Sequence, residues 1–392
     1  MDLKAAARER LESFQESVID LSHRIHAHPE VGFEEEQAST WLAEILSRAG
    51  FGVQKGICDL PTAFSAKAGN GPLHIAICAE YDCLPGLGHA CGHNIVAGMA
   101  VGAGIAVSQV ADQLGLTISV IGTPAEEIGN ASGKVILLER GAFKGVHAAM
   151  MNHPAPFDAV GNRIIAGSMF EVRYTGKEAH PAVSPELGVN AGDALTIAQT
   201  AIGLLRQHIR PTDRIHGIIT KGGDAPNITP AHTAAKYIIR ARKLEELGEL
   251  RPRVYRCFEA GALATGSKME IIGGDKPCAE MRHDPEIAAL YRRNAELLGR
   301  HFPYGDELAE HFVGSTDMGN VSLALPAIHP MININSLPAL PHQPEFAAHC
   351  ITEAADKALV DGALAMAWTV IDLATDKDLR NRLLSGSGES RG

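Results

Sequence analysis

Three apolar segments, each running into a polar loop, constrain the fold of this chain more than any other feature. Residues 73–79, 116–121 and 146–151 are almost entirely apolar, as strands covered on both faces of a sheet are. The recurring order of strand, polar loop and helix predicts an α/β fold with a largely parallel sheet and helices on both faces. Ligands bind such sheets at the carboxyl ends of the strands, so functional residues are expected there.

Polar residues gather where these three segments end. Glu80 and Asp82 follow the first, Glu126 and Glu127 follow the second, and His153 follows the third. Paired glutamates suit a metal site in which one carboxylate binds the ion and the other is a general base. We expect Asp82 to orient a ligand, with a cap at the strand end as the alternative.

The segment 89–93 (HACGH) lies between the first two of these segments and adds sulfur and nitrogen donors. Cys91 and His93 are ligands for zinc and for manganese-like ions, whereas His89 is expected to structure the loop. A buried cysteine or a core histidine would account for either residue alone. Together with the paired glutamates, the set is better explained by a metal ion that activates water.

Length, charge and cysteine usage narrow the class of protein. At 392 residues the chain is longer than a domain with a single small core usually is, so two domains are expected. Acidic residues outnumber basic ones by 46 to 35, the net charge is −11, and no dense lysine and arginine stripe is present, which argues against a nucleic-acid partner. Seven scattered cysteines and an N-terminus without an apolar signal segment predict a cytoplasmic protein.

The pattern of expected strands and helices changes near residue 165 and again near residue 282. We therefore predict one domain from residues 1–164 and 283–392, which carries the candidate metal ligands and is the catalytic metal-binding domain, with an inserted α+β domain from residues 165–282. Pro252 should interrupt the second helix of the insertion. The expected ranges in the insertion are strands at 169–174, 214–220, 234–240 and 269–272, and helices at 190–208 and 243–259.

Outside the insertion the chain is mainly helical. Residues 5–49 have an amphipathic helical pattern interrupted at residues 28–30 (HPE), and further helices are expected at 284–300 and 347–373. The apolar stretch 95–111 approaches the length of a membrane span, but its glycines and its place after the HACGH segment favour a helix buried against the sheet. The Gly/Ser-rich segment 385–392 is expected to be disordered.

Several motifs, in order along the chain, resemble one known family. The segments 79–86 (AEYDCLPG), 89–94 (HACGHN) and 123–127 (TPAEE) are similar to those of metal-dependent amidohydrolases that include aminoacylases, auxin-conjugate hydrolases, aminobenzoyl-glutamate hydrolases and related dipeptidases. The segments 314–322 (GSTDMGNVS) and 328–330 (IHP) most resemble the branch of β-alanyl-lysine dipeptidase-like proteins. The resemblance implies a zinc-exopeptidase-like fold in which the insertion, residues 165–282, is a lid or dimerisation domain.

The resemblance also implies which residues hold metal and which residue is the base. Two divalent ions per subunit, zinc, manganese or cobalt, would be bound by Cys91, His93, Glu127, His153 and His342. Glu126 would accept the proton of the attacking water and pass it to the leaving nitrogen. A thiolate at Cys91 could bridge the two ions. More distant relatives carry a histidine where this chain has Glu80, which leaves the filling of one metal position open.

A second set of active-site residues is implied in the insertion. His180, in the segment 176–180 (GKEAH), would reach the active site of a partner subunit and stabilise the oxyanion, with an exposed turn histidine as the alternative. Asn227 and Arg240 would bind polar or carboxylate groups of the substrate. A salt bridge explains Arg240 nearly as well.

Together these features predict a homodimeric enzyme that hydrolyses the amide bond of N-acyl amino acids or dipeptide-like substrates. The alternative is a non-catalytic metal-binding or regulatory relative that retains the fold; Glu126 disfavours it, because a mere binder has no use for a base. A serine hydrolase is disfavoured because no Gly-x-Ser-x-Gly motif follows a strand. The expected partners are a small amide or dipeptide substrate and a second copy of the chain, with neither nucleic acid nor membrane.

Overall fold

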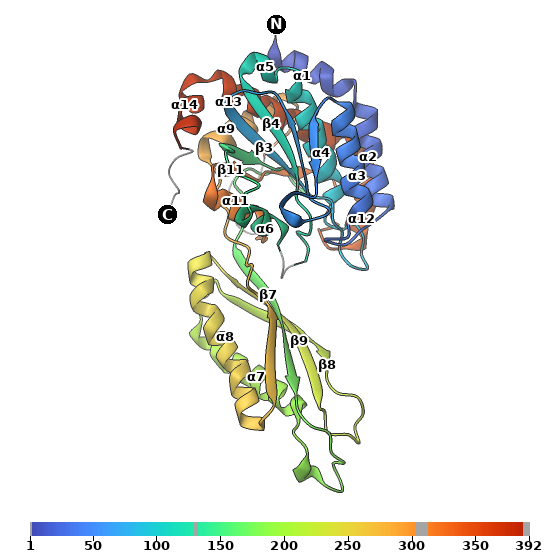
Figure 1. Cartoon of the computed structure of the whole chain (residues 1–392), viewed down its shortest axis with the longest axis vertical. Helices are drawn as coiled ribbons and strands as arrows, with labels where there is room; N and C mark the ends of the chain where they lie inside the picture. The colour runs from blue at the N-terminus through green and yellow to red at the C-terminus, as the bar shows by residue number, and fades with distance from the viewer. Residues whose placement is uncertain (1, 129–131, 303–312, 387–392) are drawn as a thin grey trace. The chain divides into compact units, whose positions relative to one another are not determined.

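The computed structural model describes residues 2–128, 132–302 and 313–386. Within these residues the chain forms two compact units (Figure 1). The first is built from residues before 165 and after 280, and the second from Ile165–Glu280. The first unit has the predicted α/β fold with a mostly parallel sheet, and the second has an antiparallel sheet with helices.

A six-stranded sheet in the order β1-β2-β4-β3-β5-β11 forms the centre of the first unit. Strands β4, β3, β5 and β11 pair in parallel, and β2 runs antiparallel to both of its neighbours. A separate parallel pair joins β6 (His153–Ala155) to β12 (Met331–Asn333). The sheet strands are β1 (Gly52–Lys55), β2 (Phe64–Ala68), β3 (Leu73–Ala79), β4 (Leu116–Gly122), β5 (Ala148–Met150) and β11 (Ala327–Ile328).

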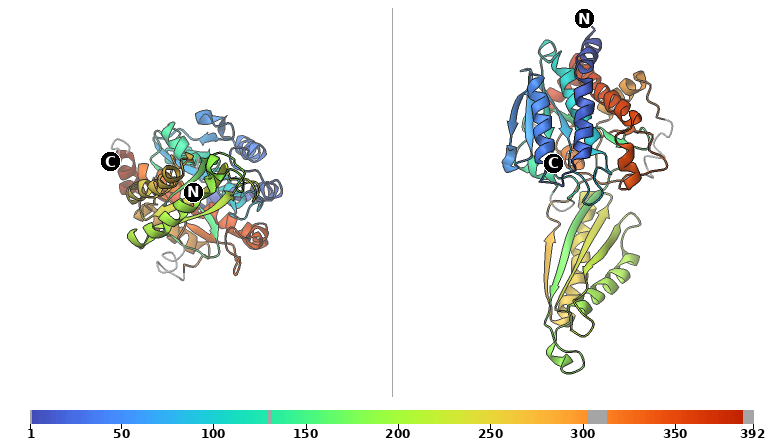
Figure 2. Two further views of the ribbon diagram at one scale, coloured as in Figure 1. Left: turned by 90° about the horizontal axis from the view of Figure 1, so that it is seen from below. Right: turned by 90° about the vertical axis from the view of Figure 1, so that its right-hand side faces the viewer.

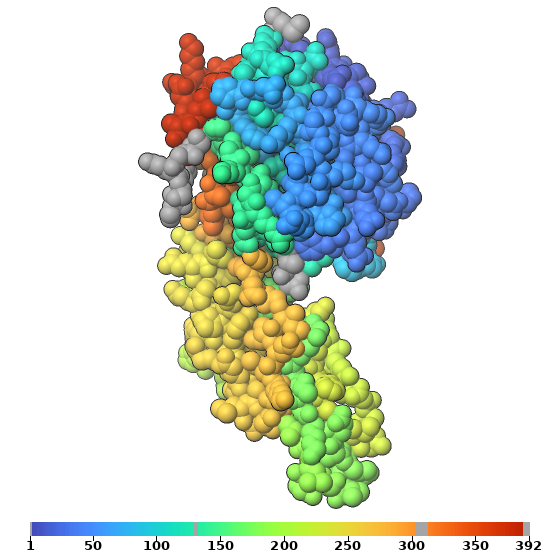
Figure 3. Space-filling model, viewed as in Figure 1, coloured from blue at the N-terminus to red at the C-terminus, as the bar shows by residue number. Residues whose placement is uncertain are grey.

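Helices cover both faces of this sheet, as the side chains of β3 show. Ile75 and Ile77 belong to one apolar cluster with helices α4 and α13, whereas Ala76 and Cys78 belong to another with α6 and α11. The N-terminal helices, blue in Figure 3, form a continuous surface of this unit. The helices are α1 (Leu3–Glu12), α2 (Gln15–Ala27), α3 (Glu36–Arg48), α4 (His93–Ser108), α5 (Ala111–Leu114), α6 (Gly133–Glu139), α9 (Pro285–Leu297), α11 (Met318–Ala324), α12 (Pro344–His349), α13 (Glu353–Thr375) and α14 (Lys377–Gly386).

Helix α4 is the predicted core helix, with every residue from His93 to Val107 buried. It packs closely on α13: a methyl group added at Gly98 would lie 2.4 Å from a methyl carbon of Leu359. Among the described helices, α13 is long and apolar enough to cross a membrane by length and composition, yet 83% of its apolar window is buried inside the unit. Its apolar character is therefore accounted for by the core.

The second unit is a four-stranded antiparallel sheet in the order β10-β7-β9-β8 with two helices (Figures 1 and 2). One apolar cluster joins the inner side chains of the sheet to both helices. Strand β8 is an edge strand, and Ile218 and Ile219 on it are 65% and 50% exposed. The elements are β7 (Ala166–Thr175), α7 (Ala191–Leu205), β8 (Arg214–Lys221), β9 (His232–Ala241), α8 (Leu244–Thr265) and β10 (Lys268–Gly273).

Three expectations about helix boundaries were wrong. Helix α8 runs through Pro252 without interruption; Pro252 and Gly248, whose carbonyl loses its helical partner, are both exposed, so water can satisfy that carbonyl. The helix expected at 347–373 is divided, because Thr352 caps a new start by accepting a hydrogen bond from the backbone of Ala355. Ser385 and Gly386, expected to be disordered, belong to α14; the rest of that expected segment, residues 387–392, lies outside the described residues.

The chain leaves the first unit and re-enters it at neighbouring points. On the first-unit side, the backbone nitrogen of Met281 donates to the carbonyl of Ile164 at 3.3 Å. On the second-unit side, Gly167 and Cys278 exchange backbone hydrogen bonds. In the described part of the chain, the second unit is thus one continuous segment, Ile165–Glu280, inserted into the first.

Candidate metal centre

The loop between β3 and α4 carries the first donors and is shaped by a glycine. Gly92 has φ of 81°, a conformation that side chains disfavour, and a methyl group there would lie 2.5 Å from Pro154. Helix α4 begins directly after it at His93. Only glycine therefore fits between the two predicted ligands Cys91 and His93.

The structure brings all five predicted ligands together in the first unit. In each of three sets, the donor atoms lie within 4.8 Å of one another. Cys91 is common to two of these sets, which share no other residue. The sets are Cys91, His93 and His153; Cys91, Glu127 and His342; and His93, Glu126 and Glu127.

Asp82 fixes the orientation of two of these residues. Its Oδ1 lies 2.9 Å from Nδ1 of His93, and its Oδ2 accepts a hydrogen bond of 2.8 Å from the backbone nitrogen of Glu127. Because Nδ1 of His93 donates to the carboxylate, Nε2 is left with its lone pair toward the other donors. This geometry supports the orienting role expected for Asp82.

His153 is directed in the same manner by its own backbone. Its Nδ1 lies 2.9 Å from the carbonyl of Pro154, and its Nε2 lies 3.6 Å from Sγ of Cys91. The ring of His329 stacks on it with 5.7 Å between centroids. Both ring nitrogens of His329 are buried without a hydrogen-bond partner among the described residues. His329 belongs to one of the family-like motifs, but no sequence pattern placed its ring beside His153.

The glutamate pair follows a left-handed residue. Ala125 has φ of 60°, and its backbone nitrogen donates to Oε1 of the buried Glu35 at 2.8 Å. The turn directs Oε2 of Glu126 to 4.0 Å from Nε2 of His93, while Oε1 of Glu127 lies 3.7 Å from Nε2 of His342. Both carboxylates also belong to one donor set with His93, so one of them can bind an ion while the other lies beside it.

His342 is the most exposed of the five, with 56% of its side chain accessible. It also has a left-handed backbone, with φ of 69°, and its backbone nitrogen donates to the carbonyl of Ala90 at 2.8 Å. This bond ties the loop before α12 to the loop that carries Cys91.

The electrostatics of the cluster favour a bound cation. Burial, together with Glu80 and Glu127, raises the pKa of Glu126 well above its ordinary value, and burial and Glu127 do the same for the Cys91 thiol. Burial and His93 lower the pKa of His153 to about 4. Nε2 of His93 and Oε1 of Glu127 are buried without a hydrogen-bond partner among the described residues. Such an unsatisfied set of sulfur, nitrogen and oxygen donors fits divalent metal ions.

A buried lysine beside this cluster was missed in the sequence. Lys134 is fully buried, and its ammonium lies 2.5 Å from Oε1 of Glu80 and 2.6 Å from Oδ1 of Asp317. Burial alone would lower the pKa of Lys134, but Asp317 and Glu80 raise it well above its ordinary value. Lys134 in turn lowers the pKa of Glu80 to about 2, against the effect of burial. Where distant relatives carry a histidine, this chain therefore has a glutamate, Glu80, that forms an ion pair with Lys134.

The other three predicted site residues belong to the second unit. His180 and Asn227 are exposed, and Arg240 is partly buried on β9, where burial lowers its pKa. Nδ1 of His180 accepts a hydrogen bond of 3.2 Å from the backbone nitrogen of Ala182. The neutral ring therefore carries its proton on Nε2, which can donate to an oxyanion.

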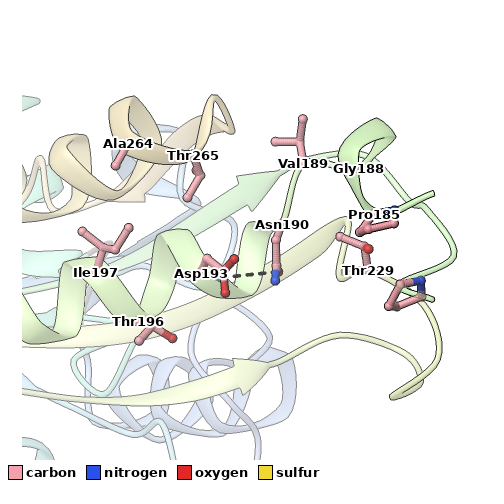
Figure 4. A pocket seen from close by; sticks show the side chains of 11 residues that line it. Pro185, Gly188, Val189, Asn190, Asp193, Thr196, Ile197, Thr229, Ala264 and Thr265 are labelled. Carbon is pink, nitrogen blue, oxygen red and sulfur yellow. Dashed lines mark hydrogen bonds between the residues drawn. The ribbon is translucent and has the colours of Figure 1, made fainter. Parts of the chain in front are cut away.

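A pocket of about 730 Å³ lies within the second unit (Figure 4). It is bordered by the start of α7 and the end of α8, where Asn190, Asp193 and Thr265 line it. Its lining includes none of the predicted site residues.

Comparisons with known proteins agree with the geometry. The sequence profile of peptidase family M20/M25/M40 matches residues 76–364. The Xaa-Arg dipeptidase of Mus musculus is 36% identical over 386 residues, which cover 95% of this chain and 89% of that protein. A component chain of the p-aminobenzoyl-glutamate hydrolase of Escherichia coli is 35% identical over 292 residues, which cover 69% of this chain and 60% of that one.

Solved structures share the fold. An aminobenzoyl-glutamate utilization protein from Klebsiella pneumoniae superposes with a TM-score of 0.72 at 18% identity, covering 92% of this chain and 97% of its own. A protein from Bacillus subtilis, described as a dinuclear metal-binding peptidase of the M20 family, has a TM-score of 0.66 at 20% identity, covering 92% and 99%.

Proposed function

Because the chain belongs to peptidase family M20/M25/M40, we propose that it is a two-metal dipeptidase that prefers dipeptides with a basic C-terminal residue. The observation that carries the two-metal proposal is that Cys91 belongs to two donor sets that have no other residue in common. A thiolate has lone pairs for two ions, so one residue can join two adjacent metal positions.

Different residues of the chain carry out proton transfer and hold the metal ligands in place. When bound, the divalent ions would polarise the amide carbonyl and lower the pKa of water. Glu126 accepts the proton of the water and delivers it to the leaving nitrogen. His93 and Glu127 are kept in place by Asp82.

The substrate class rests on similarity and on charge. Two relatives at 35% and 36% identity, of Homo sapiens and Mus musculus, are Xaa-Arg dipeptidases that match 96% and 95% of the chain. A net charge of −11 attracts cationic substrates over longer distances. Arg240 suits the terminal carboxylate that every dipeptide carries.

The proposal extends to assembly, metal and location. The active unit is a homodimer in which His180 serves the partner's site. Two observations support this: Nε2 of His180 has no hydrogen-bond partner among the described residues, and the edge strand β8 exposes Ile218 and Ile219. Zinc, manganese or cobalt suits the mixed sulfur, nitrogen and oxygen donors. The protein works in the cytoplasm, in keeping with seven cysteines that are all free thiols.

Hydrolysis of an amide panel tests the proposal. Protein stripped by a chelator and then supplied with Zn, Mn or Co is assayed with Xaa-Arg and Xaa-Lys dipeptides, neutral dipeptides, β-alanyl dipeptides, aminobenzoyl-glutamate and N-acyl amino acids. We expect metal-dependent turnover with the highest kcat/KM on Xaa-Arg or Xaa-Lys. Preference for aminobenzoyl-glutamate would reject the substrate class alone. Metal binding without turnover on any amide would instead favour a non-catalytic relative.

A further inference from the structure

Lys134 is held by carboxylates of two distant segments. Besides its ammonium contacts to Glu80 and Asp317, its backbone nitrogen donates to Oδ2 of Asp317 at 2.8 Å. Glu80 directly follows β3, Lys134 lies in the first turn of α6, and Asp317 precedes α11. All three side chains are 1% exposed or less. The lysine is therefore a fixed feature of the interior.

The carboxylates around it have the spacing of a cation site. Glu80, Glu126 and Asp317 each offer an oxygen, and these oxygens lie within 4.8 Å of one another. Carboxylate oxygens are preferred ligands of hard divalent ions such as Mn²⁺ and Mg²⁺. Glu126 also belongs to the donor set with His93 and Glu127, so this oxygen cluster adjoins the candidate metal centre.

An ammonium and a divalent ion cannot both occupy the space between Glu80 and Asp317. Buried carboxylates need a compensating charge, because an unpaired buried charge is strongly unfavourable. Lys134 supplies that charge from within the chain, at contact distances of 2.5 and 2.6 Å. The second oxygen of Glu80 lies 3.4 Å from Nε2 of His93, on the side of the donor cluster.

We propose that Lys134 is a permanent internal cation that takes the place of a divalent ion between Glu80 and Asp317, and so confines metal to the donors around Cys91. Lys134 is a positioning residue in this role, since it acts on the metal through the carboxylates it occupies. The proposal rests on the metal-binding part of the proposed function. It differs from a purely structural salt bridge in one respect: loss of the ammonium changes the number of bound ions.

Counting ions tests this proposal. Lys134→Ala removes the ammonium and leaves room at its position, and Lys134→Ala with Asp317→Asn removes one of the freed carboxylates as well. Each folded protein is stripped, reloaded with Mn²⁺, separated from free ion, and analysed for metal per chain. We expect two ions in the wild type, up to one more in Lys134→Ala, and loss of the additional ion in the double variant. A folded Lys134→Ala with the wild-type count overturns the proposal.

A second arm keeps Lys134 and changes one of its two carboxylate partners at a time, so that the other still pairs with the ammonium. Glu80→Gln and Asp317→Asn remove carboxylates that, on this proposal, face the ammonium and bind no metal. Both should keep the wild-type ion count, whereas Cys91→Ala should lose ions. A fall in ion count in Glu80→Gln or Asp317→Asn shows that the carboxylate is a ligand, and this overturns the proposal even if Lys134→Ala fails to fold. A wild-type protein that binds no metal would reject the proposed function itself, a distinct outcome.

Discussion

At the scale of single residues, Cys91 joins the donor set that contains His153 to the donor set that contains His342. His153 and His342 each belong to one three-residue donor set with Cys91, and they approach it from different segments of the chain. Its substitution should therefore act on both metal positions, and substitution of either histidine on one.

We predict that Cys91→Ala lowers metal content to well under one ion per chain, while His153→Ala retains about half of the wild-type content. Removal of a thiolate ligand weakens each site that uses it. Elemental analysis of the purified variants after reloading measures both numbers. Cys257→Ala, which removes a thiol in the second unit, is the matched control and should bind metal as the wild type does. Full occupancy in Cys91→Ala would refute the assignment of this ligand.

Glu126→Gln should retain fold and metal but lose about 10²- to 10⁴-fold in kcat, because the amide keeps the size of the side chain and cannot accept the proton. Steady-state kinetics on the best substrate, with metal content measured on the same sample, provide the check. Turnover close to that of the wild type would show that another group is the base.

The donors could be predicted because they are local and chemically distinctive. Cys91 and His93 are two residues apart, and Glu126 and Glu127 are adjacent. Lys134 could not be predicted in the same way, because its partners are 54 and 183 residues away and a single lysine in a helix is ordinarily exposed. The same holds for His329, whose place beside His153 depends on the pairing of β6 with β12.

At the scale of elements, the apolar strands and long helices were predictable from their patterns, whereas helix ends were not. The run through Pro252 depends on solvent reaching the carbonyl of Gly248, and the break before Glu353 depends on the cap at Thr352. Both are decided by one residue's surroundings.

Strand β3 shows how such surroundings also change the acidity of a side chain: His74, at its start, lies 2.9 Å from the hydroxyl of Ser119 on β4.

Burial in the sheet, with the nearby charge of Lys67, lowers the pKa of His74 to about 4. In the unfolded chain the pKa of His74 has its ordinary value of about 6.5. Between pH 6.5 and 4, His74 is therefore protonated in the unfolded state and neutral in the folded state. We predict that the free energy of unfolding of the metal-free protein decreases as the pH is lowered from 6.5 to 4. His74 contributes on the order of 1 kcal/mol to this decrease, after allowance for its partial exposure.

The measurement is urea unfolding of stripped protein at pH 7 and pH 5. His74→Gln keeps a hydrogen-bonding group and does not titrate, so its loss of stability between the two pH values should be smaller than that of the wild type. His28→Gln, a change at an exposed histidine of the same unit, is the control. Equal losses in His74→Gln and wild type would contradict the prediction.

At the scale of the whole molecule, the proposed dimer makes each active site depend on two chains. Consider co-expressed subunits, one with Glu126→Gln and the other with His180→Ala, each nearly inactive by itself. If His180 acts in trans, one of the two sites in the mixed dimer has both groups, and up to about half of the wild-type activity returns. If it acts in its own chain, every site lacks one group, at a cost of about 10²-fold or more.

Differential tags isolate the mixed dimers, and a steady-state assay on the best substrate compares them with both parents. A tagged mixture of two wild-type subunits is the matched control for the purification. Activity that stays at the level of the parent variants would reject the trans role of His180.

The discontinuity of the first unit has a consequence for the order of events on the ribosome. Among the described residues the second unit is the single segment Ile165–Glu280, so it can fold as soon as Glu280 has emerged. The first unit must wait for β11 and for α13, which packs on α4, and both are made later. Of the five predicted ligands, His342 is translated last. A nascent chain can thus carry a finished insertion while its metal centre is still open on one side.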